Sequence, residues 1–250
     1  MGPIMEKGMA GTEWYYWSIQ WFLHFQFNGW LWFAVMAVGS RWAERHGVEV
    51  HLDTTTVMLW ALGTVLTYAL AVAWIERHVA VIAVNSIGVA LQAVAAWRTL
   101  LRMRTARVQA LVRTTRWMRV LIGAMFISMA VKITAQAMVA LPAVATMALT
   151  LRNYVVGFVH LNTLGTATAL LFAHAVMKGW FAEERRPVRL GLVSFLAGYA
   201  CSELLLFAQG TCFWAGWGLL PGYYLALFAV SAVMALGIWT LLITALRPAS

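Results

Sequence analysis

The sequence predicts an all-α protein in which seven helices form a bundle across a membrane, and three observations lead to this fold class. Of the 250 residues, 62% are hydrophobic and only 11% are charged, whereas a soluble domain averages about 45–50% apolar and about 25% charged residues. The mean hydropathy is +0.76. The apolar residues gather in runs of about 20, the length that a helix needs to cross the hydrocarbon core of a bilayer.

Charged or turn-forming residues bound each apolar run and define the expected helices. The runs lie near residues 15–39, 55–75, 78–97, 117–140, 153–178, 189–209 and 221–246. Only Glu76 and Arg77 separate the second run from the third, whereas longer polar or glycine-rich segments separate most of the others. Residues 210–222 are rich in glycine and tryptophan and are expected to form an interfacial or re-entrant loop. We expect residues 1–250 to fold as a single transmembrane domain.

Basic residues alternate between the two sides of these spans. The loops after the first, third and fifth spans and the C-terminal tail carry Arg41, Arg45, Arg98, Arg102, Arg104, Arg107, Arg113, Arg116, Arg119, Lys178, Arg185, Arg186, Arg189 and Arg247. Lys7, Arg77 and Arg152 lie on the opposite side. Because cytoplasmic loops are enriched in Lys and Arg, the pattern predicts an outer N-terminus and a cytoplasmic C-terminus in the inner (plasma) membrane of a bacterium.

The net charge of +9 is explained by arginines that flank the spans and attract anionic headgroups, so membrane lipid rather than nucleic acid is the expected partner. The arginine-rich segment from Arg98 to Arg116 is expected to lie as a helix on anionic lipid.

Polar and ionisable residues inside the spans are the most informative feature, because an ionisable group at the bilayer centre costs about 2.5–3.5 kcal/mol on insertion scales. They recur at helical spacing, so each set occupies one helix face. The sets are Gln20, His24 and Asn28; Asn85 and Gln92; Ser128, Lys132 and Gln136; Asn153, His160 and His174; and Tyr199 and Glu203. At a rise of 1.5 Å per residue, His24, Asn85, Lys132, His160 and Glu203 lie roughly 9–14 Å below the outer surface.

This shared depth predicts a polar site in the outer half of the bundle. His24, His160 and Glu203 form a ligand set suited to zinc, copper or iron, and His24 with His160 would suit the axial positions of a haem b. Glu203 would act as third ligand or proton acceptor, with Lys132 as its electrostatic partner. The supporting polar residues are Gln20, Asn28, Asn85, Ser128, Gln136 and Tyr199.

Three functions remain open for such a site. The first is redox chemistry or electron transfer with quinone, a periplasmic carrier or respiratory-chain subunits. The second is a proton-coupled transporter or channel in which the same residues relay protons. The third is a non-catalytic sensor or assembly module, in which Lys132 and Glu203 form a structural ion pair. The two cysteines, Cys201 and Cys212, lack the spacing for covalent haem attachment or a cysteine-rich metal site.

Overall fold

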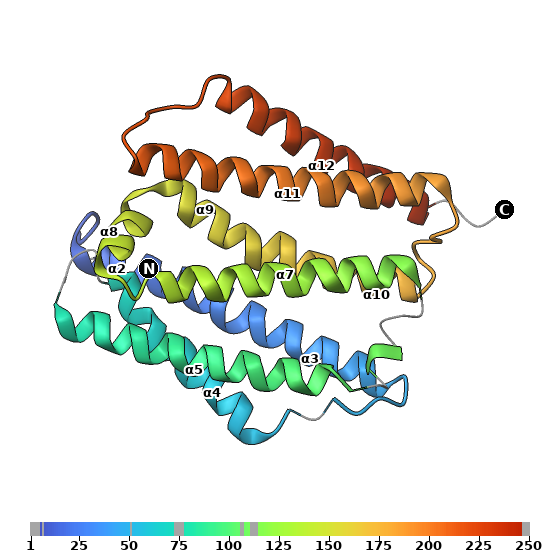
Figure 1. The fold of residues 1–250 in the computed structure, drawn as a ribbon, viewed down its shortest axis with the longest axis horizontal. Helices are drawn as coiled ribbons and strands as arrows, with labels where there is room; N and C mark the ends of the chain where they lie inside the picture. The colour runs from blue at the N-terminus through green and yellow to red at the C-terminus, as the bar shows by residue number, and fades with distance from the viewer. Residues whose placement is uncertain are drawn as a thin grey trace. The chain divides into compact units, whose positions relative to one another are not determined.

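The fold was analysed in a computed structural model that describes residues 6, 8–50, 52–72, 78–105, 108–110 and 115–246 (Figure 1). Every regular element in this part of the chain is helical, which confirms the predicted class. Within the described residues, five helices are long and apolar enough to cross a membrane: Val79–Met103, Arg116–Met138, Arg152–Met177, Arg186–Trp214 and Tyr223–Leu246. A shorter apolar helix covers Thr54–Leu70. The chain is therefore a helical membrane protein.

The chain divides into two compact units. Unit 1 comprises Met1–Leu111 and Ala130–Thr150, and unit 2 comprises Val112–Met129 and Leu151–Ser250. Helix α7 (Arg116–Met138) contributes its first part to unit 2 and its second part to unit 1.

Unit 1 begins with a helical run in which α2 (Glu13–His24), a π-helix η1 (Phe25–Trp30) and α3 (Leu31–Glu44) follow one another without interruption. It continues with α4 (Thr54–Val72), α5 (Val79–Met103) and the short α8 (Pro142–Thr150). Glycines bring α4 and α5 close together. A Cβ atom on Gly63 would lie 2.9 Å from the carbonyl oxygen of Gly88, and one on Gly88 would lie 2.8 Å from the amide nitrogen of Thr67. Such small residues are typical of helix contacts in membranes.

Unit 2 has the same kind of helical run, formed by α9 (Arg152–His160), a second π-helix η2 (Leu161–Thr168) and α10 (Ala169–Met177). It is followed by α11 (Arg186–Trp214) and α12 (Tyr223–Leu246), which run side by side (Figure 1). Glycines again permit the contact, because a Cβ atom on Gly198 would lie 2.8 Å from the carbonyl oxygen of Val230.

The loop expected at residues 210–222 starts later than predicted, because α11 continues to Trp214. Gly210 belongs to the helix, where it lets the ring of Tyr154 pack closely: a Cβ atom there would lie 2.9 Å from two ring carbons. The fully buried Gln209 ties down the remaining loop by donating to the carbonyl of Gly218 at 3.0 Å and accepting from the amide of Leu220 at 2.9 Å. The prediction of a loop from the glycine-rich composition therefore holds only for residues 215–222.

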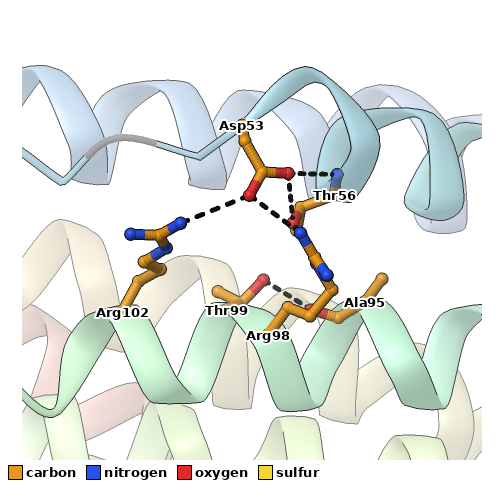
Figure 2. Close-up of polar contacts among 6 residues, drawn as sticks. All are labelled: Asp53, Thr56, Ala95, Arg98, Thr99 and Arg102. Atoms are coloured by element: carbon orange, nitrogen blue, oxygen red, sulfur yellow. Dashed lines mark hydrogen bonds and ion pairs between the residues drawn. The ribbon is translucent and has the colours of Figure 1, made fainter.

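The arginine-rich segment also differs from the prediction, because α5 extends to Met103 and includes Arg98 and Arg102. Figure 2 shows both guanidinium groups turned toward Asp53, with Nη2 to Oδ2 distances of 2.9 Å for Arg98 and 3.4 Å for Arg102. Asp53 directly precedes α4 and caps it, accepting from the amide and the hydroxyl of Thr56, both at 2.8 Å. These two arginines therefore join α4 to α5, a role that the prediction of a lipid-bound helix missed.

Several sequence predictions fall on residues outside the described part of the chain. They concern the short interruption at Glu76 and Arg77, and the basic residues Lys7, Arg107, Arg113 and Arg247.

Candidate functional site

His24 is the last residue of α2 and directly precedes η1 in unit 1. Its Nε2 lies 2.8 Å from the carbonyl oxygen of Thr64 on α4. A carbonyl only accepts, so Nε2 carries the proton and donates. The lone pair then resides on Nδ1, to which the amide of Asn28 donates over a long 3.4 Å. The rings of Phe25 and Tyr68 flank the imidazole, with centroids 5.1 and 5.7 Å away.

His160 is the last residue of α9 and directly precedes η2 in unit 2. Its Nδ1 lies 3.0 Å from Oε1 of Glu203 on α11. When the carboxylate is ionised and the imidazole is neutral, Nδ1 donates and Nε2 keeps the lone pair. Glu203 is buried, and its Oε2 has no hydrogen-bond partner among the described residues. Gly157, nearly one turn before His160, leaves room for this contact, since a Cβ atom there would lie 3.4 Å from Oε2 and 3.0 Å from the ring of Phe207.

The two histidines thus occupy equivalent positions in two separate helical runs. Each ends an α-helix, each precedes a π-helix, and each is followed five residues later by a glycine, Gly29 or Gly165. A π-helix is rare, and its single widened turns are frequent at functional sites. The spacing His-x4-Gly occurs three times in the sequence, at His24, His160 and His174, and the first two instances lie before a π-helix, whereas His174 lies within α10. It is a signal that the sequence analysis did not use.

Close packing and hydroxyl groups hold η2 in place. A Cβ atom on Gly165 would collide with the hydroxyl groups of Ser128 and Tyr199, which hydrogen-bond to each other at 2.8 Å. Thr166 donates to the carbonyl of Leu161 at 2.8 Å, one of two such threonine bonds that span five residues within η2. The predicted supporting residues Ser128 and Tyr199 therefore lie together beside the π-helix, with Tyr199 one turn from Glu203 on α11.

A buried polar cluster surrounds His24 in unit 1. The amide nitrogen of Gln92 lies 3.4 and 3.5 Å from the hydroxyl oxygens of Thr64 and Thr67, and Thr64 donates to the carbonyl of Asn28 at 3.4 Å. Asn28 Oδ1, Asn85 Nδ2 and Gln92 Oε1 have no hydrogen-bond partner within the described ranges. Asn28 thus lies beside His24, and Gln92, Thr64 and Thr67 are members of the cluster that the sequence analysis did not assign to the site.

Lys132 lies on α7 with only 1% of its surface exposed, and its ammonium nitrogen is 5.1 Å from the ring centroid of Trp32. This is the geometry of a cation–π contact, which stabilises a buried lysine when it carries its charge. Gln136, one turn later, is buried as well, and Gln20 is half-buried on α2, one turn before His24.

The remaining polar residues of the fifth span lie apart from the pair of His160 and Glu203. Asn153 donates to the hydroxyl of Tyr223 at 2.8 Å, and His174 lies edge-on to Trp180 with ring centroids 6.2 Å apart. Cys201 and Cys212 are both free thiols on α11.

The structure therefore brings together His160 with Glu203, and Ser128 with Tyr199, all in unit 2. His24 and Lys132 belong to unit 1, so the meeting of His24 with His160, and of Lys132 with Glu203, stays a prediction. Among the described residues, no three His, Cys, Asp or Glu side chains gather as a metal-ligand group. No family model, curated protein or solved structure matches this chain. Its function has to be argued from the side chains alone.

Proposed function

We propose that this protein binds a haem b or a transition-metal ion through His24 and His160 and uses it for electron transfer or oxidoreductase chemistry in a bacterial inner membrane. One observation carries the proposal. Each histidine stands at the start of a π-helix with one ring nitrogen held by a strong acceptor, Thr64 or Glu203, and the other nitrogen left as a Lewis base.

This arrangement is the one that metal-binding histidines use. A ligating imidazole almost always donates its second N–H to a carboxylate or a backbone carbonyl, which fixes the tautomer and raises the basicity of the ligating nitrogen. His160 would bind through Nε2 and His24 through Nδ1, displacing the long contact from Asn28. Glu203 then orients His160 instead of serving as third ligand. Two imidazoles suit haem iron, and also copper or zinc, while Lys132 would be the electrostatic partner of Glu203.

The proposed topology has seven spans in a single transmembrane domain. The helical run from Glu13 to Glu44 and the apolar helix at Thr54–Leu70 would add two spans to the five long helices. With the N-terminus outside, both histidines lie toward the periplasm, where a quinone, a periplasmic carrier or respiratory-chain subunits would exchange electrons with the centre.

Purified protein in detergent tests the proposal by absorption spectroscopy and elemental analysis. We expect a Soret band or about one equivalent of iron, copper or zinc, because one pair of imidazoles holds one haem or metal ion. His24→Ala and His160→Ala should each lower this content strongly. His174→Ala is the matched control, since it removes an imidazole of the same membrane helix that has no place in the centre. A colourless, metal-free protein, or equal losses in all three variants, would contradict the proposal.

A proton relay is the second candidate, and the unpaired Oε2 of Glu203 favours it. A carboxyl group hydrogen-bonded to an imidazole passes a proton readily, and such pairs mark proton pathways in transporters. In liposomes loaded with a pH-sensitive dye, this function predicts proton uptake that Glu203→Gln abolishes, in protein that is free of haem and metal. A sensor or assembly module would show neither cofactor nor proton uptake.

A further inference from the structure

A second site lies in unit 2 and does not involve the histidine pair. It is a cavity of about 510 Å³ lined by three aromatic residues, Phe172, Trp180 and Phe181, and by the C-terminal turns of α12 from Ile238 to Ala245. This volume falls within the roughly 300–1,000 Å³ that is usual for small-molecule sites. None of the lining side chains is charged, and among them only Trp180 carries a hydrogen-bond donor, so the lining favours the hydrocarbon part of a ligand.

The cavity lies where two membrane-spanning helices end. Phe172 is in the next-to-last turn of α10, which ends at Met177, and Ala245 is next to the end of α12 at Leu246. Helix ends of this kind stand at the boundary between the acyl chains and the headgroups of a bilayer, where tryptophan is also enriched. A hydrocarbon chain in the cavity would therefore continue into a headgroup at the surface.

Basic residues gather beside this boundary. The loop that joins α10 to α11 and the first turn of α11 carry four basic residues, Lys178, Arg185, Arg186 and Arg189, against Glu183 and Glu184. Lys178, Arg186 and Arg189 are exposed. Cations in this position attract the phosphate groups of anionic lipids. An apolar cavity with a cationic rim matches an acidic phospholipid better than a quinone, whose carbonyl groups would find only Trp180 in the wall.

We propose that unit 2 binds one acidic phospholipid, with an acyl chain in this cavity and its phosphate at Lys178 and Arg186. The site is independent of the histidine centre, so either proposal can fail without the other.

Binding of the acyl chain in the cavity is tested by native mass spectrometry of the detergent-purified full chain, titrated with phosphatidylglycerol or phosphatidylcholine. Ala245→Trp puts a large side chain into the lining of the cavity, and we expect it to remove the tightest-bound phosphatidylglycerol. Ala235→Trp is the matched control, because it makes the same change at an exposed position of α12 outside the cavity. Unchanged binding in Ala245→Trp, or equal loss in both variants, would overturn the proposal. Leu242→Ser makes the wall polar without adding volume and should weaken binding even if the tryptophan variant fails to fold.

The headgroup site is tested by the preference between the two lipids. We expect phosphatidylglycerol to bind more tightly than phosphatidylcholine, and Lys178→Gln and Arg186→Gln each to weaken it about fivefold. Arg45→Gln, which removes an exposed cation of unit 1, should change nothing. Equal affinity of the two lipids, or equal effects of the three variants, would refute the role of the cationic rim.

Discussion

At the scale of single residues, a hydrogen bond decides which nitrogen of a neutral imidazole is available for chemistry. Thr64 holds Nε2 of His24, whereas Glu203 holds Nδ1 of His160, so the two rings leave opposite nitrogens as lone-pair donors. The difference matters because a haem iron usually meets Nε2, while smaller metal ions accept either nitrogen. In the proposed centre, the cofactor that would bind therefore depends on whether His24 keeps its hydrogen bond to Thr64.

The bond between Glu203 and His160 gives a prediction for affinity. Glu203→Ala should lower metal or haem affinity about 10- to 100-fold, because partners that orient a ligating histidine contribute that much. Glu203→Gln should lose less, since its amide oxygen still accepts from Nδ1. Equilibrium titration of the cofactor into the apo-protein measures both, with Ser202→Ala as a control for change at the neighbouring position. Equal affinity of the alanine variant and the unchanged protein would exclude this role.

Asp53 gives a prediction for pH dependence. The amide and hydroxyl of Thr56 and the guanidinium of Arg98 hold the pKa of the Asp53 carboxyl well below its usual range. A carboxyl with a depressed folded-state pKa stabilises the fold above its unfolded pKa of about 3.9, and that contribution is lost as the pH falls toward the folded value.

At neutral pH, the melting temperature of Asp53→Ala should therefore be lower than that of Asp53→Asn, and both should be lower than that of the unchanged protein. The reason is that asparagine keeps the helix cap but loses the ion pairs. The differences should shrink on acidification below pH 4. Glu49→Gln, at an exposed acid of the same loop, should leave the melting temperature unchanged at both values. A difference in melting temperature between Asp53→Asn and the unchanged protein that does not change with pH would contradict the depressed pKa of Asp53.

At the scale of elements, the two π-helices are the most informative local structures. A π-turn gives up regular i to i−4 bonding and persists only where packing over-determines it. In η2 that packing is visible at Gly165, where the hydroxyls of Ser128 and Tyr199 occupy the volume that a side chain would need. The glycine thus fixes how α11 and η2 meet, and through α11 the place of Glu203.

Gly165→Ala should therefore destabilise the protein by about 1–3 kcal/mol, the usual cost of overpacking. Gly123→Ala is the control: this glycine is in α7, and a Cβ atom there meets nothing within 4 Å. In a helix interior that change is neutral or stabilising by up to about 1 kcal/mol. The stabilities of Gly165→Ala and Gly123→Ala are compared by thermal unfolding in the same detergent. Equal stability of the two variants would show that η2 has space beside Gly165.

At the scale of the whole molecule, topology is the property that the proposed functions share. The alternation of basic loops predicts an external loop at Ala215–Gly222 and a cytoplasmic loop at residues 178–185. In intact cells, a membrane-impermeant maleimide should label Trp217→Cys and should label Glu184→Cys only after lysis, in a background where Cys201 and Cys212 are replaced. Labelling of both positions from outside, or the reverse pattern, would contradict the orientation and move the histidines to the cytoplasmic half.

The sequence alone determined the helical membrane class and most helix positions. Each expected run coincides with a helix or a helical run of the structure, because about twenty apolar residues have to satisfy their backbone within one helix in lipid. The sequence-based prediction was wrong where one residue type can play two structural roles. Gly210 packs against Tyr154 instead of ending α11, and Arg98 pairs with Asp53, a partner that the sequence did not predict.

Only the tertiary structure determined which residues on different helices form hydrogen bonds with each other. Helical spacing puts Gln20, His24 and Asn28 on one face, but it does not say that Thr64 faces them, nor that Glu203 pairs with His160, because such contacts join residues about forty apart in the chain. It also decided the π-helices: the glycine of His-x4-Gly is local, whereas the side chains that crowd Gly165 come from α7 and α11. Periodicity is a property of one helix, whereas a hydrogen-bonded site is a property of several, and only their packing determines it.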